Sequence, residues 1–116
     1  MEAKGNVILD LTLEFALEII SYCEELEQKR RYVIGHQLLK CGTSIGANAR
    51  EAQNSESKAD FIHKMKIAAK EEEETEYWLI LCLNSTGYPA CESLLLQIKS
   101  IQKVLAKILS STKRSA

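Results

Sequence analysis

Apolar residues recur every three or four positions along most of the chain, and this period is typical of amphipathic α-helices. Near the C-terminus, for example, Leu94, Ile98, Ile101, Leu105 and Ile108 alternate steps of four and three. No strand pattern competes with the helical one. The pattern predicts four helices, at about residues 10–31, 33–53, 57–85 and 90–110.

Capping and turn residues set the predicted helix boundaries. Ser57 followed by Asp60 resembles an N-terminal capping arrangement. Gly87 and Pro89 end the third helix, because proline cannot continue the hydrogen-bond ladder. No proline or clear cap marks the boundary between the first two helices. Residues Ser110–Ala116 are expected to form a loose tail.

Short connections between four helices favour an all-α, antiparallel up-down-up-down four-helix bundle, because neighbours joined by few residues must run in opposite directions. A chain of 116 residues fits one such domain, spanning residues 1–116. Composition agrees with this prediction. With 46% hydrophobic residues, 27% charged residues and one proline, the chain has a globular balance and not a disordered one.

The sequence favours a cytoplasmic protein. No apolar run approaches the roughly 20 residues that span a bilayer, and Met1–Asp10 lacks a basic segment followed by an apolar signal core. The cysteines show no CxxC spacing and lie in or beside apolar helical patterns, which favours buried thiols over zinc or disulfide roles. They are Cys23, Cys41, Cys82 and Cys91.

Gly42 and Gly46 lie four positions apart inside a helical pattern, and Ala49 extends this stripe of small residues. Glycine inside a helix costs about 1 kcal/mol relative to alanine, so something must approach this surface closely. We expect a second helix to pack there, either from the same chain or from another subunit. A backbone surface exposed for a ligand is the alternative.

Carboxylates occupy every side of the helix between Lys70 and Glu76, so at least one must point toward the bundle interior. The inner stripe of this helix passes through Glu72 and Thr75, and a buried glutamate needs a polar partner. A structural polar network is the preferred interpretation, and a solvated charge run is the alternative. The predicted network comprises Asn48, Glu51, Lys70 and Glu72.

Basic residues cluster twice, although the net charge of −1 argues against a surface wholly committed to nucleic acid or to an anionic membrane. The first cluster is a candidate for contact with phosphate. It surrounds the junction of the first two helices and comprises Lys29, Arg30, Arg31, His36 and Lys40. The candidate nucleic-acid-binding residues are Lys29, Arg30, Arg31, Lys40 and Arg50. The second cluster either assists the first or solvates the last helix, and it comprises Lys99, Lys103, Lys107, Lys113 and Arg114.

No catalytic or metal-binding set stands out. Di-iron sites in helical bundles use inward-facing glutamates and Glu-x-x-His pairs. At that spacing Val33 precedes His36, and Asp60 precedes His63. The sequence also lacks a nucleophile pattern and a phosphate-binding glycine loop. We therefore predict no metal, no cofactor and no enzymatic activity.

A dense set of residues between Gln37 and Leu81 carries a family resemblance. It includes Gln37, Leu38, Leu39, Thr43, Ser44, Ile45, Gly46, Ala47, Asn48, Glu51, Ala52, Asp60, Phe61, Lys64, Ile67, Ala68, Lys70, Glu71, Glu74, Tyr77, Trp78 and Leu79. This segment resembles the four helix bundle protein family named after proteins encoded in intervening sequences of 23S ribosomal RNA genes. The resemblance implies an antiparallel bundle that assembles as a ring, commonly a homopentamer, with no established enzymatic activity.

The family is similar in turn to accessory proteins of diversity-generating retroelements, whose pentameric barrels bind nucleic acid and a reverse transcriptase. Those relatives look much more basic than this chain. Our leading hypothesis is a non-enzymatic, homo-oligomeric interaction module, with a pentamer favoured, that presents a composite surface to a macromolecular partner. The alternative is an accessory protein that binds RNA or DNA through basic patches of the oligomer.

Overall fold

The chain forms four α-helices over residues 6–114, the part that the computed structural model describes. No strand occurs within this part, so the predicted all-α class is confirmed. The helices are α1 (Val7–Gln28), α2 (Tyr32–Ala52), α3 (Lys58–Asn84) and α4 (Glu92–Arg114).

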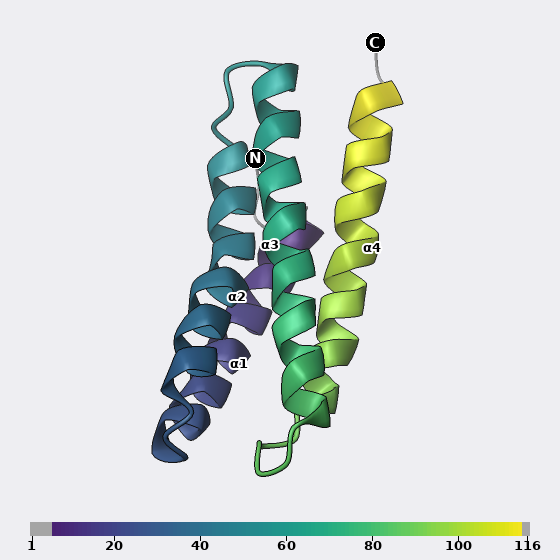
Figure 1. The fold of residues 1–116 in the computed structure, drawn as a ribbon. Coiled ribbons are helices and arrows are strands. Elements are labelled where there is room, and N and C mark those ends of the chain that lie inside the picture. Colours follow the sequence, from purple (N-terminus) through teal and green to yellow (C-terminus); the bar gives the residue numbers. More distant parts are fainter. Residues whose placement is uncertain (1–5, 115–116) are drawn as a thin grey trace.

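Consecutive helices run in opposite directions. In Figure 1 the chain descends along α1, ascends along α2, descends along α3 and ascends along α4. α1 packs against α2 and α4, and α3 packs against the same two helices. Over residues 6–114, α1 and α3 do not pack against each other, and neither do α2 and α4. The α1–α2 side and the α3–α4 side are therefore opposite faces of the bundle.

Each helix contributes one buried stripe to the core between the four helices. Phe15 of α1, Ile45 of α2, Leu79 of α3 and Ile98 of α4 are all 0% exposed. Burying a side chain of this size stabilises a fold by about 1.5–3 kcal/mol. One copy of the chain therefore has a complete core of its own.

The first helix begins earlier than the sequence predicts. α1 starts at Val7 instead of near residue 10, because the Asn6 side chain caps the helix and accepts a hydrogen bond from the Leu9 N–H at 3.4 Å. Ile8 in this added turn is buried, at 2% exposure. The capping bond and the buried isoleucine together account for the extra turn.

The last helix is longer than predicted, since α4 continues to Arg114. The predicted loose tail over Ser110–Ala116 is therefore wrong up to that residue, and residues 115–116 lie outside the described part. Ile108 and Leu109 still pack against the core. Basic residues lie in the last turn, where positive charge is favourable.

The turn between α1 and α2, which no sequence signal marks, is a Schellman-type helix end. The Arg31 N–H donates to the Leu26 carbonyl at 2.8 Å, and the Arg30 N–H donates to the Glu27 carbonyl at 2.9 Å. Arg30 has a φ of 61°, which is the left-handed conformation that favours glycine. An arginine therefore occupies the position where such turns normally have glycine.

Arg30→Gly is expected to stabilise the protein by up to about 1 kcal/mol. The left-handed conformation costs a non-glycine residue roughly 1–2 kcal/mol, and the greater entropy of glycine in the unfolded chain offsets part of the gain. Urea denaturation measures the free energy of unfolding. Arg30→Ala is the control, because it removes the guanidinium group and keeps the Cβ. An equal gain from both variants would assign the effect to charge and not to the backbone.

Candidate interaction surfaces

The small-residue stripe of α2 lies against α1 of the same chain. A Cβ atom on Gly42 would stand 2.9 Å from Cγ2 of Ile19, and one on Gly46 would stand 3.0 Å from Oγ1 of Thr12. Ala49 is 0% exposed. The stripe therefore lets α1 and α2 approach each other closely. Its glycines face a neighbour within the chain, so they are not the surface that a second subunit would meet.

Exposed apolar side chains line the outer side of α1 and α2, and sequence reasoning missed them. They are Leu13 (53% exposed), Leu17 (60%), Ile20 (41%) and Leu39 (38%). We call these four residues the α1–α2 face. A groove of about 230 Å³ between the two helices is lined in part by Ile20 and Leu39, and Glu24 and Glu27 border it.

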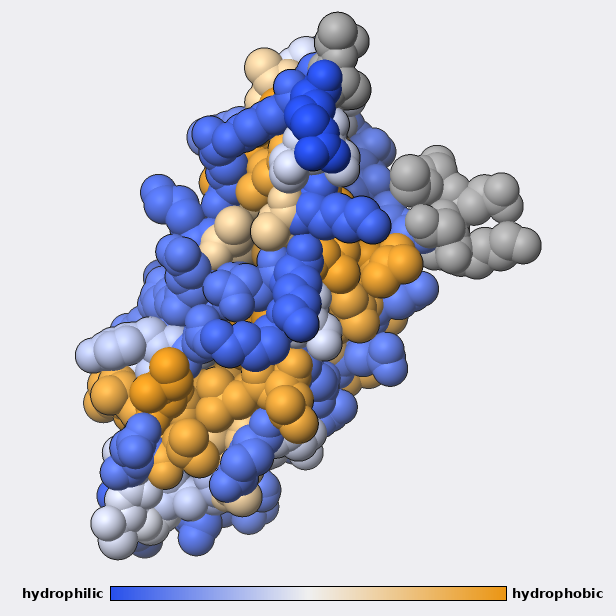
Figure 2. All heavy atoms as spheres, turned by 90° about the vertical axis from the view of Figure 1, so that its right-hand side faces the viewer, coloured by the Kyte–Doolittle hydropathy of each residue, from blue (hydrophilic) through white to orange (hydrophobic). Residues whose placement is uncertain are grey.

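A second group of exposed apolar side chains lies on the opposite side of the bundle. Figure 2 shows apolar side chains gathered over the lower part of the side that α4 presents, bordered by hydrophilic ones. The exposed residues are Tyr77 (58%), Ile80 (41%), Leu83 (44%) and Leu96 (73%). We call these four residues the α3–α4 face. Lys99 lies one turn beyond Leu96 on α4 and pairs with Glu76 of α3 at 2.6 Å.

The helices α1 and α4 differ in charge. α1 has no lysine or arginine between Val7 and Gln28, and all its acidic residues are exposed. These acidic residues are Asp10, Glu14, Glu18, Glu24, Glu25 and Glu27. On α4, Glu92 is the sole acidic residue, whereas exposed lysines recur along the helix at Lys99, Lys103 and Lys107. Acidic residues therefore predominate on α1, and lysines predominate on α4. Basic side chains also lie on the α1–α2 side, where Arg31 and His36 line the groove with Ile20 and Leu39.

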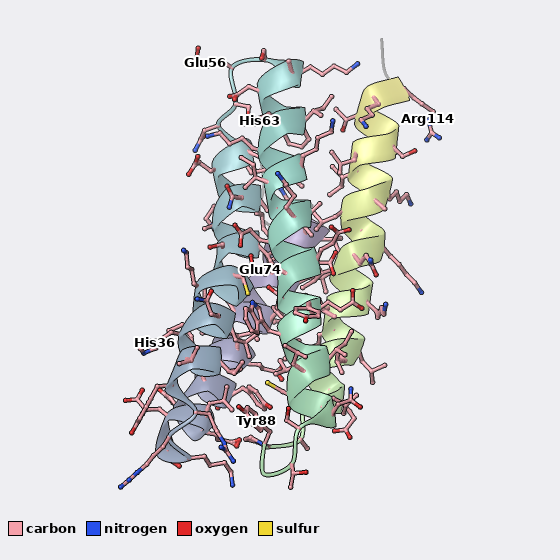
Figure 3. The ribbon with its side chains drawn as sticks, in the orientation of Figure 1. His36, Glu56, His63, Glu74, Tyr88 and Arg114 are labelled. Atoms are coloured by element: carbon pink, nitrogen blue, oxygen red, sulfur yellow. The ribbon has the colours of Figure 1, made fainter. Side chains whose placement is uncertain are left out.

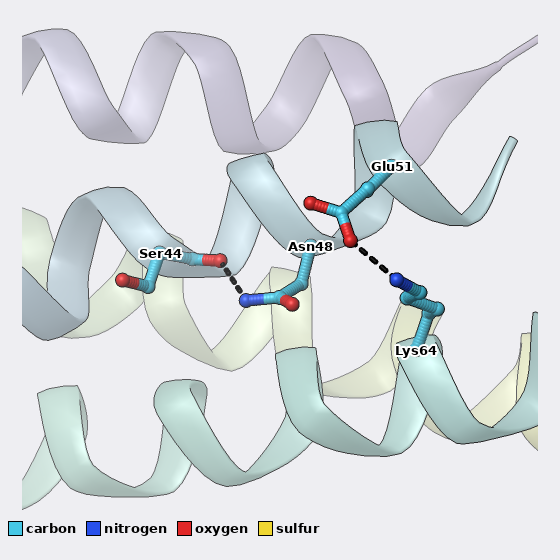
Figure 4. A network of polar contacts seen from close by, with 4 residues as sticks. All are labelled: Ser44, Asn48, Glu51 and Lys64. Atoms are coloured by element: carbon cyan, nitrogen blue, oxygen red, sulfur yellow. Dashed lines mark hydrogen bonds and ion pairs between the residues drawn. The ribbon is translucent and has the colours of Figure 1, made fainter. Parts of the chain in front are cut away.

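The structure does not form the predicted polar network. In Figure 4 the Asn48 side chain donates to the Ser44 carbonyl at 2.9 Å, and Glu51 pairs with Lys64 of α3. Lys70 is exposed. Asn48 thus satisfies its amide one turn back along its own helix and does not reach across to α3. Asn48 can reach the Ser44 carbonyl without any bend in the backbone, which explains why its amide bonds within α2.

Glu72 is the member of that set that the bundle buries. It is 2% exposed, and its Oε2 atom has no hydrogen-bond partner within residues 6–114. Burial raises the pKa of this carboxyl group to about 7, and the neighbouring charges of Glu76 and Glu73 add to the increase. Lys99 acts in the opposite direction. Within residues 6–114 no lysine or arginine forms an ion pair with Glu72, and burial favours the protonated form of its carboxyl group.

The five candidate nucleic-acid-binding residues do not form one patch. Lys29 and Arg30 lie at the turn after α1, whereas Arg50 lies in the last turn of α2. Lys40 lies between them on α2, and a separation of ten helical residues corresponds to about 15 Å along the axis. A single phosphate group could not touch all of these side chains.

Arg31 connects the α1–α2 turn to the loop between α3 and α4. Its guanidinium carbon lies 4.8 Å from the centre of the Tyr88 ring, and Nη2 lies 2.8 Å from where a Cβ on Gly87 would stand. Nearby, the Tyr22 hydroxyl donates to the Pro89 carbonyl at 2.8 Å. Figure 3 places Tyr88 at the lower end of the bundle, in the loop between α3 and α4. These contacts give Arg31 a structural role.

The histidines lie on separate helices, and the cysteines are buried. Figure 3 shows His63 near the top of α3 and His36 in the lower half of α2. No three His, Cys, Asp or Glu side chains in this part of the chain are grouped so as to hold a metal ion. The four cysteines are free and buried, and burial raises the pKa of each thiol, that of Cys23 to about 12. Such thiols are poor nucleophiles.

The chain is similar to known proteins in both sequence and structure. A family model described as 23S rRNA-intervening sequence protein matches residues 4–107. A solved structure of a protein with unknown function, from the S23 ribosomal protein family of Bacteroides thetaiotaomicron, is similar with 42% sequence identity and a TM-score of 0.85. The match covers 89% of this chain and 98% of that chain. The comparison with curated proteins gives no match.

Neither of the two matching descriptions names a reaction. In the part of the chain from residue 6 to residue 114, no helix combines the length and the apolar character that crossing a membrane requires.

Proposed function

Because the chain belongs to the 23S rRNA-intervening sequence protein family, we propose that it is a non-enzymatic interaction module that works as a homo-oligomer, with five copies as the expected number. The observation that carries this proposal is the pair of exposed apolar faces on opposite sides of the bundle. A monomer that already has a complete core has no need of either face.

Exposed apolar side chains that are grouped and rimmed by charge mark protein contacts more often than they mark ordinary surface. Leu17 and Leu96 are each at least 60% exposed, so covering them removes apolar area from water and favours association. The assembled copies then present a repeated surface, in the cytoplasm, to a further macromolecular partner. Repetition would raise the avidity of a weak contact without any new chemistry.

Native mass spectrometry and light scattering test this proposal. We expect a dominant species near five times the 13.0 kDa mass of the chain, stable on dilution through the low micromolar range. A ring with a different number of copies would correct the expected ring size and would still support a homo-oligomeric interaction module. A monomer at all concentrations up to about 100 μM, where even weak specific interfaces associate, would contradict the proposal.

Nucleic-acid binding is a second candidate, and the observation in its favour is the exposed lysine strip of α4. An oligomer would repeat this strip around its surface. In a filter-binding titration with single- and double-stranded RNA and DNA, genuine phosphate contacts give an affinity that falls steeply with added salt. Lys103→Gln with Lys107→Gln is expected to reduce this salt dependence. If the protein retains no nucleic acid on the filter at low salt, or if the retention does not depend on the salt concentration, nucleic-acid binding through the lysine strip is wrong.

A further inference from the structure

We infer that the groove between α1 and α2 binds one free α-amino acid with an apolar side chain. This inference goes beyond the proposed homo-oligomer, because it assigns a small ligand to each copy of the chain. The groove has a volume of about 230 Å³. Sites for drug-sized ligands have about 300–1,000 Å³, so this groove suits a single amino acid better than a nucleotide. Leu13 and Leu17 of the α1–α2 face do not line it.

Charges of both signs line the groove, and they do not pair with one another over residues 6–114. Glu24 and Glu27 of α1 are exposed, and neither forms an ion pair in this part of the chain. Arg31, at the start of α2, also lines the groove and has no carboxylate partner there. A ligand that carries both an ammonium and a carboxylate group can pair with both kinds of charge at once. A simple anion or cation would satisfy one kind only, so a zwitterion is the ligand class that fits.

The Arg31 guanidinium is already held in place by a contact outside the groove. Its central carbon lies 4.8 Å from the centre of the Tyr88 ring, and this contact uses the flat face of the group. The N–H groups at the edge of a guanidinium match the two oxygens of a carboxylate. A side chain that is fixed in advance also loses less entropy on binding. The ligand carboxylate is therefore assigned to Arg31, and the ammonium group to Glu24 and Glu27.

The end of the groove further from the α1–α2 turn is apolar. Ile20 and Leu39 line this end, and they are 41% and 38% exposed. The seven helical residues between Ile20 and Glu27 correspond to about 10 Å along the axis. Gly35 also lines the groove, and its lack of a side chain lets a ligand approach the backbone. An apolar ligand side chain that points toward Ile20 and Leu39 removes apolar surface from water.

Calorimetric titration with L-leucine and three simpler compounds tests the ligand class. We expect one leucine per chain, with a dissociation constant of about 1 mM or lower. Isoamylamine lacks the carboxylate of leucine, isocaproate lacks the ammonium group, and glycine lacks the apolar side chain. Each of the three is expected to bind at least about tenfold more weakly, because each loses one of the three groups of contacts. Saturation-transfer NMR detects binding that gives little heat.

The double variant Glu24→Gln with Glu27→Gln tests the residues assigned to the ammonium group. It should weaken leucine binding at least about fivefold, because two exposed charge contacts are lost. Glu14→Gln with Glu25→Gln is the matched control. It removes the same charge from exposed positions of the same helix that do not line the groove, so it should bind leucine as the wild type does. Circular dichroism should show both variants folded.

Three results would overturn the inference. They are no binding of leucine to the wild type up to about 10 mM, equal affinity for leucine and isocaproate, and equal affinity of the two double variants for leucine. The solution mass of the wild type is a separate measurement, so a failure of the amino-acid site leaves the homo-oligomer standing. In the same way, a monomeric wild type that binds leucine would contradict the proposed function and keep this site.

Discussion

Gly42→Leu is expected to lower the free energy of unfolding by about 3 kcal/mol, which is a large share of the stability of a small domain. Even a Cβ at this position would stand 2.9 Å from Cγ2 and 3.1 Å from Cγ1 of Ile19. Ile19 is 0% exposed, so its side chain has no free space into which it could turn. Either α1 and α2 separate, or the isoleucine leaves its preferred rotamer.

The same helix supplies a matched control. A Cβ on Gly35 would stand 3.6 Å from the Leu26 Cβ, which is an ordinary van der Waals contact. Gly35→Ala should therefore be neutral or stabilising by up to about 1 kcal/mol, because alanine favours a helix more than glycine does. Gly42→Ala should be destabilising instead. Thermal and urea denaturation of the two alanine variants thus give opposite signs if close packing explains Gly42.

A double-mutant cycle adds a sharper test. Ile19→Ala removes the three side-chain carbons that a Cβ on Gly42 would meet. In that background, Gly42→Ala should cost at least about 1 kcal/mol less than it does in the wild type, because the two sites share one contact. Additive effects of the two substitutions would mean that the clash with Ile19 is not the cause.

The helices themselves follow from the sequence, because one apolar stripe per helix fixes both the period and the inward face. The stripe through Leu94 and Ile98 is an example, and both residues are buried. The helix ends are less predictable. α1 gains a turn through a side-chain cap from Asn6, and the turn after α1 relies on a left-handed Arg30, a residue type that carries no turn signal.

The surfaces were harder to predict than the fold. Small residues such as Gly42 indicate a close neighbour, but the spacing is the same whether that neighbour belongs to the chain or to another copy. The amphipathic pattern of α1 does not mark Leu13 and Leu17 as exposed, and only the bundle geometry shows that they lie outside the core. The polar network failed for a related reason. Periodicity placed Glu72 inside, yet it could not show that Asn48 bonds within its own helix.

Glu72→Gln is expected to raise the free energy of unfolding above pH 7 by up to about 3 kcal/mol. The carboxyl group is 2% exposed and lacks a hydrogen bond at Oε2 within the described chain, so ionising it inside the bundle is unfavourable. The increase in its pKa from 4.5 to about 7 corresponds to this energy at about 1.4 kcal/mol per pH unit. Glutamine keeps the shape of the side chain and removes the charge.

The pH dependence has a definite sign. The folded protein binds the Glu72 proton more tightly than the unfolded chain does, so this group contributes its full stability below about pH 4.5. The contribution is lost as the pH rises through about 7, where the folded carboxyl group ionises. The difference in stability between Glu72→Gln and the wild type should therefore be small near pH 4 and should grow to a plateau above pH 7.

Glu73→Gln separates burial from net charge, because Glu73 is the adjacent carboxylate and is exposed. It removes the same charge from the same helix turn, and its stability difference from the wild type should change with pH much less than that of Glu72→Gln, because the Glu73 charge raises the Glu72 pKa less than burial does. Urea denaturation of the three proteins between pH 4 and pH 8 supplies the comparison. Parallel profiles for the wild type and Glu72→Gln would mean that the Glu72 carboxylate is stabilised in the fold by a partner, and that its burial does not limit the stability of the bundle at neutral pH.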